Sequence, residues 1–268
     1  MCKRSEPDPL LRLFVDLYNL HLLAIPRENS SVGDLYVHDG RRTSAPGSVT
    51  HFLTPRFTLP PVARDERMAD VAGTLSQGVD VKVGLGLLEG FLTAMGGGGL
   101  IGDTKAEFVR TGTRTLRFRF GEATRDSIDP FLLGGTLAGH AFDKGNAVHG
   151  QGHRYYLVTA VVRSRSIGVT AERERTMSAE LNVEALKVAD VGGGVTIRKS
   201  SQGEVTFAGD KALAFGVELY ELVEGEHGEG MRLRAPESAV RVRGRRKAPL
   251  PEPAFIGGME GDAFLTLG

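Results

Sequence analysis

Alternation between apolar and polar positions is clearest in the segment that begins at residue 79. Apolar side chains occupy every odd position and polar residues or glycine lie between them, which predicts a strand with one apolar face. The apolar members are Val79, Val81, Val83, Leu85 and Leu87. From Leu88 the apolar spacing becomes helical, and it ends at four glycines, Gly96 to Gly99. Because Phe91 and Met95 also continue the odd-numbered series, this segment is compatible with both a strand and a helix.

Two further segments show the alternation of a strand. In TRTLRFRF the apolar side chains share one side and the arginines share the other; the apolar ones are Leu116, Phe118 and Phe120. In KALAFGVELYELVEG every second residue is large and apolar, which predicts a core strand carrying Leu213, Phe215, Val217 and Leu219.

A β-hairpin is predicted between these two segments. A long apolar run from Tyr155 to Val169 is followed by a charged turn candidate, Glu172 to Arg175. A second alternating run follows and contains Met177, Ala179, Leu181, Val183 and Ala185. Each arm reaches the roughly 9 to 11 residues that a tilted strand needs to cross a bilayer. An ordinary hairpin that covers the core of a soluble protein is the alternative.

Short elements are predicted nearer the N-terminus. Asp8 and Pro9 form a helix start, and apolar residues at helical spacing predict a helix over about residues 9–19. Asp34 to Val37 is a predicted strand that ends at the Asp39-Gly40 turn. Prolines at positions 46, 55, 60 and 61 are expected to prevent any long element between them.

Composition narrows the class of protein. The formal net charge is zero, so a broadly basic surface for nucleic acid is not expected. Glycine accounts for 36 of 268 residues, roughly twice its usual share, which favours a permissive backbone. The first thirty residues lack the pattern of a secretory signal, so a cytosolic location is expected. Cys2 is the single cysteine and cannot form an internal disulfide; an inert terminal thiol is one interpretation.

Motifs for catalysis are incomplete. Gly97 and Gly102 have the spacing of a phosphate-binding loop, but Asp103 stands where a lysine is required. The pair Gly84 and Gly86 continues to Glu89 where the dinucleotide fingerprint needs a third glycine. His149 and His153 have the spacing of metal ligands, but no cysteine accompanies them and a solvated loop is the simpler interpretation. We therefore expect no enzyme, no catalytic residues and no metal.

The C-terminus changes character abruptly. A basic run ending at Lys247 is followed by Pro249, Pro251 and Pro253, which impose an extended linker. Such a run is accessible to a protease, and the predicted cleavage region comprises Gly244, Arg245, Arg246, Lys247, Ala248, Pro249 and Leu250. Beyond it lies an apolar set able to cover a groove on the body, in particular Phe255, Ile256, Phe264 and Leu265. The prediction is a body of residues 1–247 and a regulatory tail of residues 248–268; a passive terminus is the alternative.

Several of these segments resemble the gasdermins, in particular the compact bacterial gasdermins. YYLVTAVVRSRS from Tyr155 is similar to the family's Tyr-Val-Val-Thr-Glu strand, with Ala160 in place of the usual glutamate. LAFGVELYELV from Leu213 is similar to its Leu-Ala-Phe/Tyr-Arg-Val strand, with Gly216 in place of arginine. LLRLFVDLYNLHLLAIPRENS resembles the family's opening helix and the Leu-hydrophobe-Pro turn that follows it.

The resemblance implies a fold and a function. The implied fold is α+β: a central, twisted, mostly antiparallel sheet with surrounding helices, able to refold into the membrane β-hairpins of a large oligomeric barrel. The implied function is that of a pore-forming protein that is a monomer at rest. After a protease removes its tail, it oligomerises and permeabilises the membrane. The expected inserting segments are Val79 to about Phe120 and Tyr155 to about Val191.

The resemblance also implies a location and a modification. The protein is expected to be cytoplasmic when inactive and at the cell inner membrane when activated, where it kills the cell in defence against phage. Its implied partners are the activating protease, membrane lipids and further copies of itself, with no nucleic acid. Cys2 is implied to carry a palmitoyl-type acyl group, with no other cofactor. The competing hypothesis is a soluble β-rich binding module in which Leu116, Phe118 and Phe120 line a pocket under a C-terminal lid.

Overall fold

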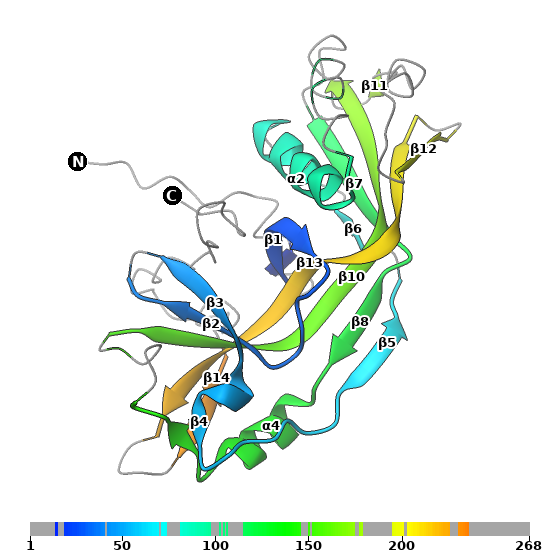
Figure 1. Cartoon of the computed structure of the whole chain (residues 1–268). Coiled ribbons are helices and arrows are strands. Elements are labelled where there is room, and N and C mark those ends of the chain that lie inside the picture. Colours follow the sequence, from blue (N-terminus) through cyan, green and yellow to red (C-terminus); the bar gives the residue numbers. More distant parts are fainter. Residues whose placement is uncertain are drawn as a thin grey trace, which may run out of the picture.

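The computed structural model (Figure 1) describes residues 14–15, 19–40, 42–69, 71–73, 81–97, 102, 104, 106, 115–145, 150, 152–174, 177–178, 195–200, 203–225 and 230–235. The strands in these residues are β1 (His21–Arg27), β2 (Asp34–His38), β3 (Thr43–Ser48), β4 (Leu53–Thr54), β5 (Ala63–Arg67), β6 (Val71–Gly73), β7 (Thr115–Gly121), β8 (Thr124–Ser127), β9 (Ala141–Phe142), β10 (Arg154–Glu174), β11 (Met177–Ser178), β12 (Thr196–Lys199), β13 (Val205–Glu224) and β14 (Met231–Arg234). The helices are the 3-10 helix η1 (Val49–His51) and the α-helices α2 (Val81–Ala94) and α4 (Pro130–Leu137).

Two long antiparallel strands, β10 and β13, form the spine of the molecule and run side by side through most of its length (Figure 1). Shorter strands pair with the outer edge of each. β2, β8 and β7 follow one another along β10, while β14, β1 and β12 pair with β13. Twelve of the described strands belong to this one open, twisted sheet, and every strand pair in it is antiparallel. The predicted α+β fold class is therefore confirmed.

The alternating segments are strands where the sequence predicted them. Leu116, Phe118 and Phe120 are buried on one face of β7. The core strand predicted from Lys211 is part of β13, which begins earlier, at Val205, and its predicted apolar positions are all buried. The long run from Tyr155 lies in β10, and Glu174 pairs with Met177, which confirms the start of the predicted hairpin. Of its second arm only Met177–Ser178 lies within the described residues.

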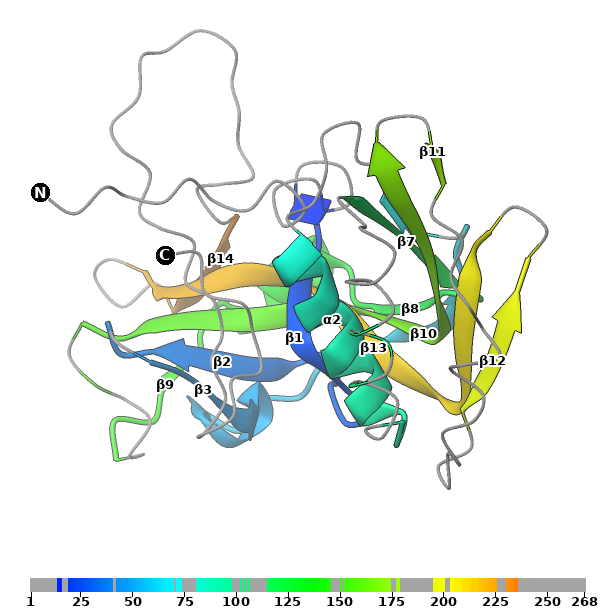
Figure 2. The same cartoon turned by 90° about the horizontal axis from the view of Figure 1, so that it is seen from above.

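The strand predicted from Val79 to Leu87 is wrong for this structure. Residues 81 to 94 form the helix α2, so the helical period that was assigned only from Leu88 begins seven residues earlier. The buried positions of the helix are Leu87, Leu88, Gly90, Phe91 and Leu92. The helix contacts β1, β13 and β7, and Figure 2 shows it lying across β1. This packing decides between the two periods.

Glycine ends α2 at a defined position. The N–H of Gly96 donates to the carbonyl oxygen of Thr93, and the N–H of Gly97 donates to that of Leu92. Gly96 has a φ of +85°, so this arrangement is a Schellman motif with glycine in the left-handed position. Met95 is therefore the C-cap residue, between the last residue of α2 and the glycine turn.

In the N-terminal region the structure agrees with the predicted helix but has a strand where a turn was expected. Residues 14 and 15 are helical, as predicted, and the N–H of Asn19 donates to the carbonyl oxygen of Val15. Asn19 has a φ of +53°, which asparagine tolerates better than most residues. The Leu-hydrophobe-Pro turn that the resemblance implies falls at Pro26, which is instead part of β1. The register of β1 against β13 shifts between Leu22 and Arg27, so these residues form an irregularity within the strand. A strand irregularity accommodates Pro26, which cannot donate a ladder hydrogen bond.

The turn predicted after β2 is present. The N–H of Asp39 donates to the carbonyl oxygen of Arg42, and Gly40 has a φ of +93°. In the proline-containing region that follows, the elements are short, from β3 to β5, as the sequence predicted.

Candidate functional site

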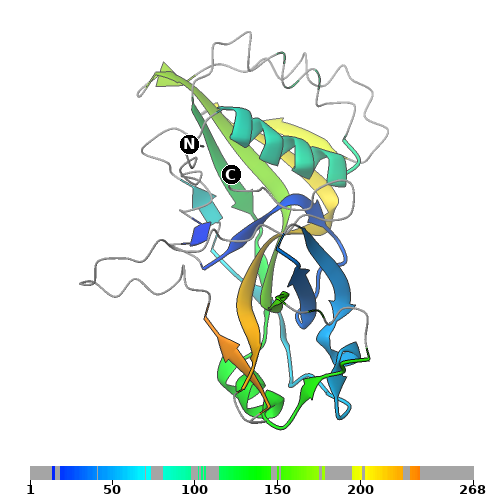
Figure 3. The same cartoon turned by 90° about the vertical axis from the view of Figure 1, so that its left-hand side faces the viewer.

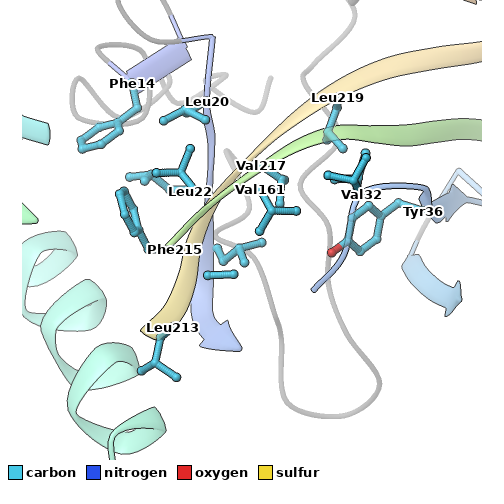
Figure 4. Packing of buried hydrophobic residues seen from close by; sticks show 14 of the residues in the cluster. Phe14, Leu20, Leu22, Val32, Tyr36, Val161, Leu213, Phe215, Val217 and Leu219 are labelled. Atoms are coloured by element: carbon cyan, nitrogen blue, oxygen red, sulfur yellow. The ribbon is translucent and has the colours of Figure 1, made fainter. Parts of the chain in front are cut away.

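An aromatic cluster joins four segments that are far apart in the sequence. The ring of Phe120 in β7 stacks on that of Phe215 in β13, with centroids 3.9 Å apart and an interplanar angle of 5°. Phe91 in α2 lies 5.7 Å from Phe120, and Phe14 of the N-terminal helix lies 6.1 Å from it at an angle of 82°. All four side chains are buried, and Figure 4 shows Phe14 and Phe215 on the side of the core that faces α2. Separation of α2 from β7 therefore requires this cluster to open.

The helix α2 is intrinsically weak. Gly84, Gly86 and Gly90 lie within its 14 residues, and each costs about 1 kcal/mol of helix stability relative to alanine. An ideal Cβ at Gly86 would meet no atom within 4 Å, so packing does not require glycine there. The helix is consequently stable because its apolar face is buried against the sheet, and a loss of that contact would leave little to preserve it.

The regular strand pairing of the sheet is interrupted at the same height on both edges of β10 and within β10 itself. On one edge of β10, β7 ends at Gly121 and β8 begins at Thr124. In β10 the register shifts between Ser164 and Ser166, where the buried Ser164 hydroxyl lies 2.5 Å from the carbonyl oxygen of Gly121. On the other edge, residues 209–212 of β13 bulge out of the ladder. We call this level the sheet break. Figure 1 shows it between a lower half that contains β2, β8 and β14 and an upper half that contains α2, β6, β7 and β12.

A buried ion pair stabilises the lower half at the sheet break. The Arg163 guanidinium donates to the Asp126 carboxylate at 2.7 Å and to the Ser30 carbonyl oxygen at 2.6 Å. The Asp126 carboxylate also accepts the N–H of Asp65 at 2.9 Å. Because 16% of the Arg163 side chain and 10% of the Asp126 side chain remain exposed, removing one partner should cost less than the about 3–5 kcal/mol typical of a fully buried pair. β5, β8 and β10 are thus fixed together below the break.

The upper half is connected by a more exposed ion pair. Arg119 of β7 approaches Glu204, which precedes β13, with 2.5 Å between Nη2 and Oε1. Between the two strands lies Gly168 of β10, where an ideal Cβ would collide with the Glu204 carboxylate. Because half of the Arg119 side chain is exposed, this pair adds little free energy compared with the buried one.

Two ionisable groups with shifted pKa values lie on β1 and β13, one buried and one partly buried. Burial lowers the pKa of His21 in β1 to about 4, because the charged imidazolium is poorly solvated there. Burial also raises the pKa of Glu218 in β13, although the Arg125 guanidinium at 2.7 Å opposes that shift. Neither group is accompanied by a nucleophile or a metal cluster; among the described residues no three His, Cys, Asp or Glu side chains converge on one point.

A small pocket opens beside the bulge of β13. Its volume is about 280 Å³, and it lies between the end of α2, the bulge and the end of β1. The ion pair of Lys211 with Glu28, at 2.9 Å, lies at this pocket. Leu116, Phe118 and Phe120 do not line it; they pack within the core, so the pocket of the competing hypothesis does not form at those residues.

Some of the predicted site residues lie within the described structure, and the others lie outside it. Val81, Val83, Leu85 and Leu87 belong to α2, and the Leu87 side chain is fully buried against the sheet. The others lie outside the described residues: Cys2, Val79, Leu181, Val183, the cleavage region Gly244 to Leu250 and the tail residues Phe255, Ile256, Phe264 and Leu265. Within the described part of the chain no helix is both long and apolar enough to cross a membrane.

Comparison with known proteins supports the interpretation of these segments. The Bacterial Gasdermin Family matches residues 23–229, which is most of the chain. The chain belongs to this family. A gasdermin (bGSDM) from Vitiosangium sp. is 28% identical over 209 residues, covering 75% of this chain and 76% of its own. A gasdermin from Lysobacter enzymogenes is 29% identical over 213 residues, covering 76% of each.

A solved structure shares the fold of this gasdermin. The structure of a bacterial gasdermin from Bradyrhizobium tropiciagri superposes with a TM-score of 0.62 at 18% sequence identity. The superposition covers 88% of this chain and 94% of that chain. Gasdermins are a family of pore-forming, non-enzymatic proteins.

Sequence reasoning missed two features of this region. The sheet break was not predicted, although GDKA at 209–212 carries a weak signal, since a glycine and two charged residues interrupt an apolar alternating run. The buried pair of Arg163 and Asp126 was also missed. Its residues are 37 positions apart in the sequence, and no local pattern links them.

Proposed function

We propose that this gasdermin is held inactive by its tail, residues 248–268, and that a protease activates it by cutting between Gly244 and Leu250. The body of residues 1–247 then oligomerises and inserts two β-hairpins per subunit into the inner membrane. The resulting permeabilisation kills the cell, with defence against phage as the proposed biological role. No catalytic residue is invoked.

The observation that carries this proposal is the conformation of α2. Its residues have the alternation of a strand, yet they form a helix that contains three glycines. In the chain β6 precedes α2 and β7 follows it, and these two strands already pair with each other. Figure 3 shows α2 lying across the upper half of the sheet. If α2 becomes a strand, β6, α2 and β7 supply one extended hairpin. The predicted segment from Tyr155 to about Val191, which begins in β10 and continues past its turn, supplies the second.

A closed set of paired strands meets the requirement of the bilayer. Every backbone group in the hydrocarbon region must be hydrogen-bonded within the protein, and closed strand pairing achieves this. Each strand then needs only one apolar face, since the other faces the pore. The odd-numbered series Val79 to Leu87 would provide such a face.

A liposome assay tests the proposal. Full-length protein is made with a recognition site for a sequence-specific protease in place of residues 245–250, and it is mixed with dye-loaded vesicles of anionic phospholipid. We expect dye release only after addition of the protease. A full-length chain without the inserted site, treated with the same protease, is the control. Absence of release from the cleaved protein would favour a soluble binding module instead.

A further inference from the structure

We propose that the contact between Met95 and Gly209 is a latch that makes the two membrane segments convert together. This inference rests on the proposed function, since it concerns how the two hairpins are released. Met95 is the C-cap residue directly after α2, in the first segment. Gly209 begins the bulge of β13, which adjoins the second segment.

The contact leaves less than ordinary room for a side chain at position 209, so a residue with a Cβ there must displace Met95 by a few tenths of an ångström. An ideal Cβ at position 209 would lie 3.0 Å from the Met95 sulfur and 3.2 Å from its Cγ, both tighter than ordinary van der Waals contact. The φ of Gly209 is not in the left-handed region, so backbone conformation does not require glycine at this position. Proximity to α2 is therefore what restricts the residue, and the Schellman turn at Gly96 fixes the helix end that approaches it.

The bulge stores chain that a continuous strand cannot accommodate. Between the pairs Ser164–Leu213 and Ser166–Ala208, β10 advances by two residues while β13 advances by five. The three additional residues protrude toward α2 and β1, where Lys211 forms its ion pair with Glu28. A straight β13 that pairs with β10 across the sheet break has no place for this protrusion, so straightening withdraws Gly209 from Met95.

The contact therefore makes the helical state of α2 and the bulge of β13 stabilise each other. While α2 remains a helix on the sheet, Met95 covers the bulge and opposes its straightening. While the bulge is present, it supports the end of a helix that has little stability of its own. Loss of either element removes the support of the other, so we infer that the two hairpins are released in one step.

A disulfide between the two positions tests the latch. An ideal Cβ at Gly209 lies 3.6 Å from the Met95 Cβ, within the separation that a disulfide requires. The double variant Met95→Cys/Gly209→Cys is prepared in the full chain with the inserted protease site. Each single variant, which retains Cys2, controls for other disulfides. After cleavage we expect dye release from the oxidised double variant to be at least about tenfold slower than from the same protein reduced.

The outcomes separate the latch from pore formation. Equal release from the oxidised and reduced double variant would overturn the latch and leave pore formation intact, and failure of the two thiols to join would contradict the contact itself. If the cleaved wild-type protein releases no dye, the proposed function is wrong, and the latch with it.

A second variant covers the case in which the double variant folds poorly. Gly209→Val places a branched side chain against Met95, and Gly216→Ala in the same strand is the matched control, because its Cβ would meet Leu20 at an ordinary 3.6 Å. We expect Gly209→Val to increase amide hydrogen exchange throughout α2 and to speed dye release after cleavage about tenfold. Unchanged exchange in α2 would overturn the coupling, and Gly216→Ala should leave exchange in α2 unchanged.

Discussion

The rings of Phe120 and Phe215 stack at a centroid distance of 3.9 Å, and Phe91 approaches the same stack from α2. Phe215 belongs to β13 below the sheet break, whereas Phe120 belongs to β7 above it. In the proposed conversion the lower half of the sheet persists and the upper half extends. The stack therefore connects a part that stays in place with a part that moves. Because Phe91 of α2 lies against it, release of α2 frees this stack to rearrange.

Leu87 and Leu88 provide the first test of that rearrangement. Both are buried in the α2 face, with 0% and 1% exposure, so Leu→Asn at either position should weaken the resting state by a similar amount. In a strand the two side chains point to opposite faces. Only Leu87→Asn then places an amide against lipid. We expect Leu88→Asn to release dye faster than Leu87→Asn after cleavage; equal rates would contradict the predicted facing.

Helix stability should control the rate of activation. Gly86→Ala adds a methyl group in open space and stabilises α2 by about 1 kcal/mol, so dye release after cleavage should slow by about fivefold. Gly135→Ala in α4 is the matched control, because its Cβ also meets nothing within 4 Å. Both variants should raise the thermal midpoint, but only Gly86→Ala should slow release. A similar slowing by Gly135→Ala would indicate a general stability effect.

Charge on the predicted lipid face should abolish leakage. A lysine at the bilayer midplane costs roughly 2 to 4 kcal/mol in each subunit of a transmembrane barrel. Val81→Lys and Leu85→Asp should therefore prevent dye release from the cleaved protein, whereas Lys82→Ser, on the opposite face, should not. Circular dichroism of the uncut variants checks that the resting fold is retained. Equal dye release from all three would show that the odd-numbered residues do not face lipid.

Alternation predicted the sheet well where one face is buried, as in β7 and toward the ends of β13, because the local pattern and the tertiary environment agree there. In the middle of β10 and β13 both faces are buried, and a continuous apolar run marks the strand instead. Alternation failed at α2, where the same residues satisfy two periods and only the docking surface formed by β1, β13 and Phe120 selects the helix. The sheet break is a consequence of register between distant strands, and no window of sequence contains that information. The same limit applies to Met95 and Gly209, which are more than a hundred residues apart.

Acylation of Cys2 is a separate prediction. The family resemblance implies the modification, and Lys3 and Arg4 would favour the reactive thiolate. A single acyl chain anchors a protein only marginally, so its expected roles are to fill an apolar groove at rest and to assist insertion. Intact mass analysis of protein from its natural host should show an acyl mass that hydroxylamine removes and that Cys2→Ala lacks. An unmodified Cys2 in fully active protein would contradict the prediction.

Acid pH should destabilise the resting fold through His21. The pKa of this histidine falls from 6.5 to about 4 on folding, so between these values the unfolded chain binds a proton that the folded protein does not. The contribution of neutral His21 to the free energy of unfolding is therefore fully present above pH 6.5 and is lost as the pH falls toward 4. The decrease amounts to about 2 kcal/mol between pH 7 and 5. The raised pKa of Glu218 acts with the opposite sign, because its native carboxyl retains a proton more readily, and it offsets part of the loss at the acid end.

Urea unfolding at pH 7 and pH 5 measures this effect. We expect His21→Gln to flatten the pH dependence of the unfolding free energy, because glutamine does not titrate. His51→Gln, at an exposed histidine in η1, should retain the wild-type dependence. Since α2 packs on β1, the wild-type protein should also release dye faster after cleavage at pH 5 than at pH 7, and His21→Gln should lose most of that difference. A pH dependence that survives in His21→Gln would assign the effect to other groups.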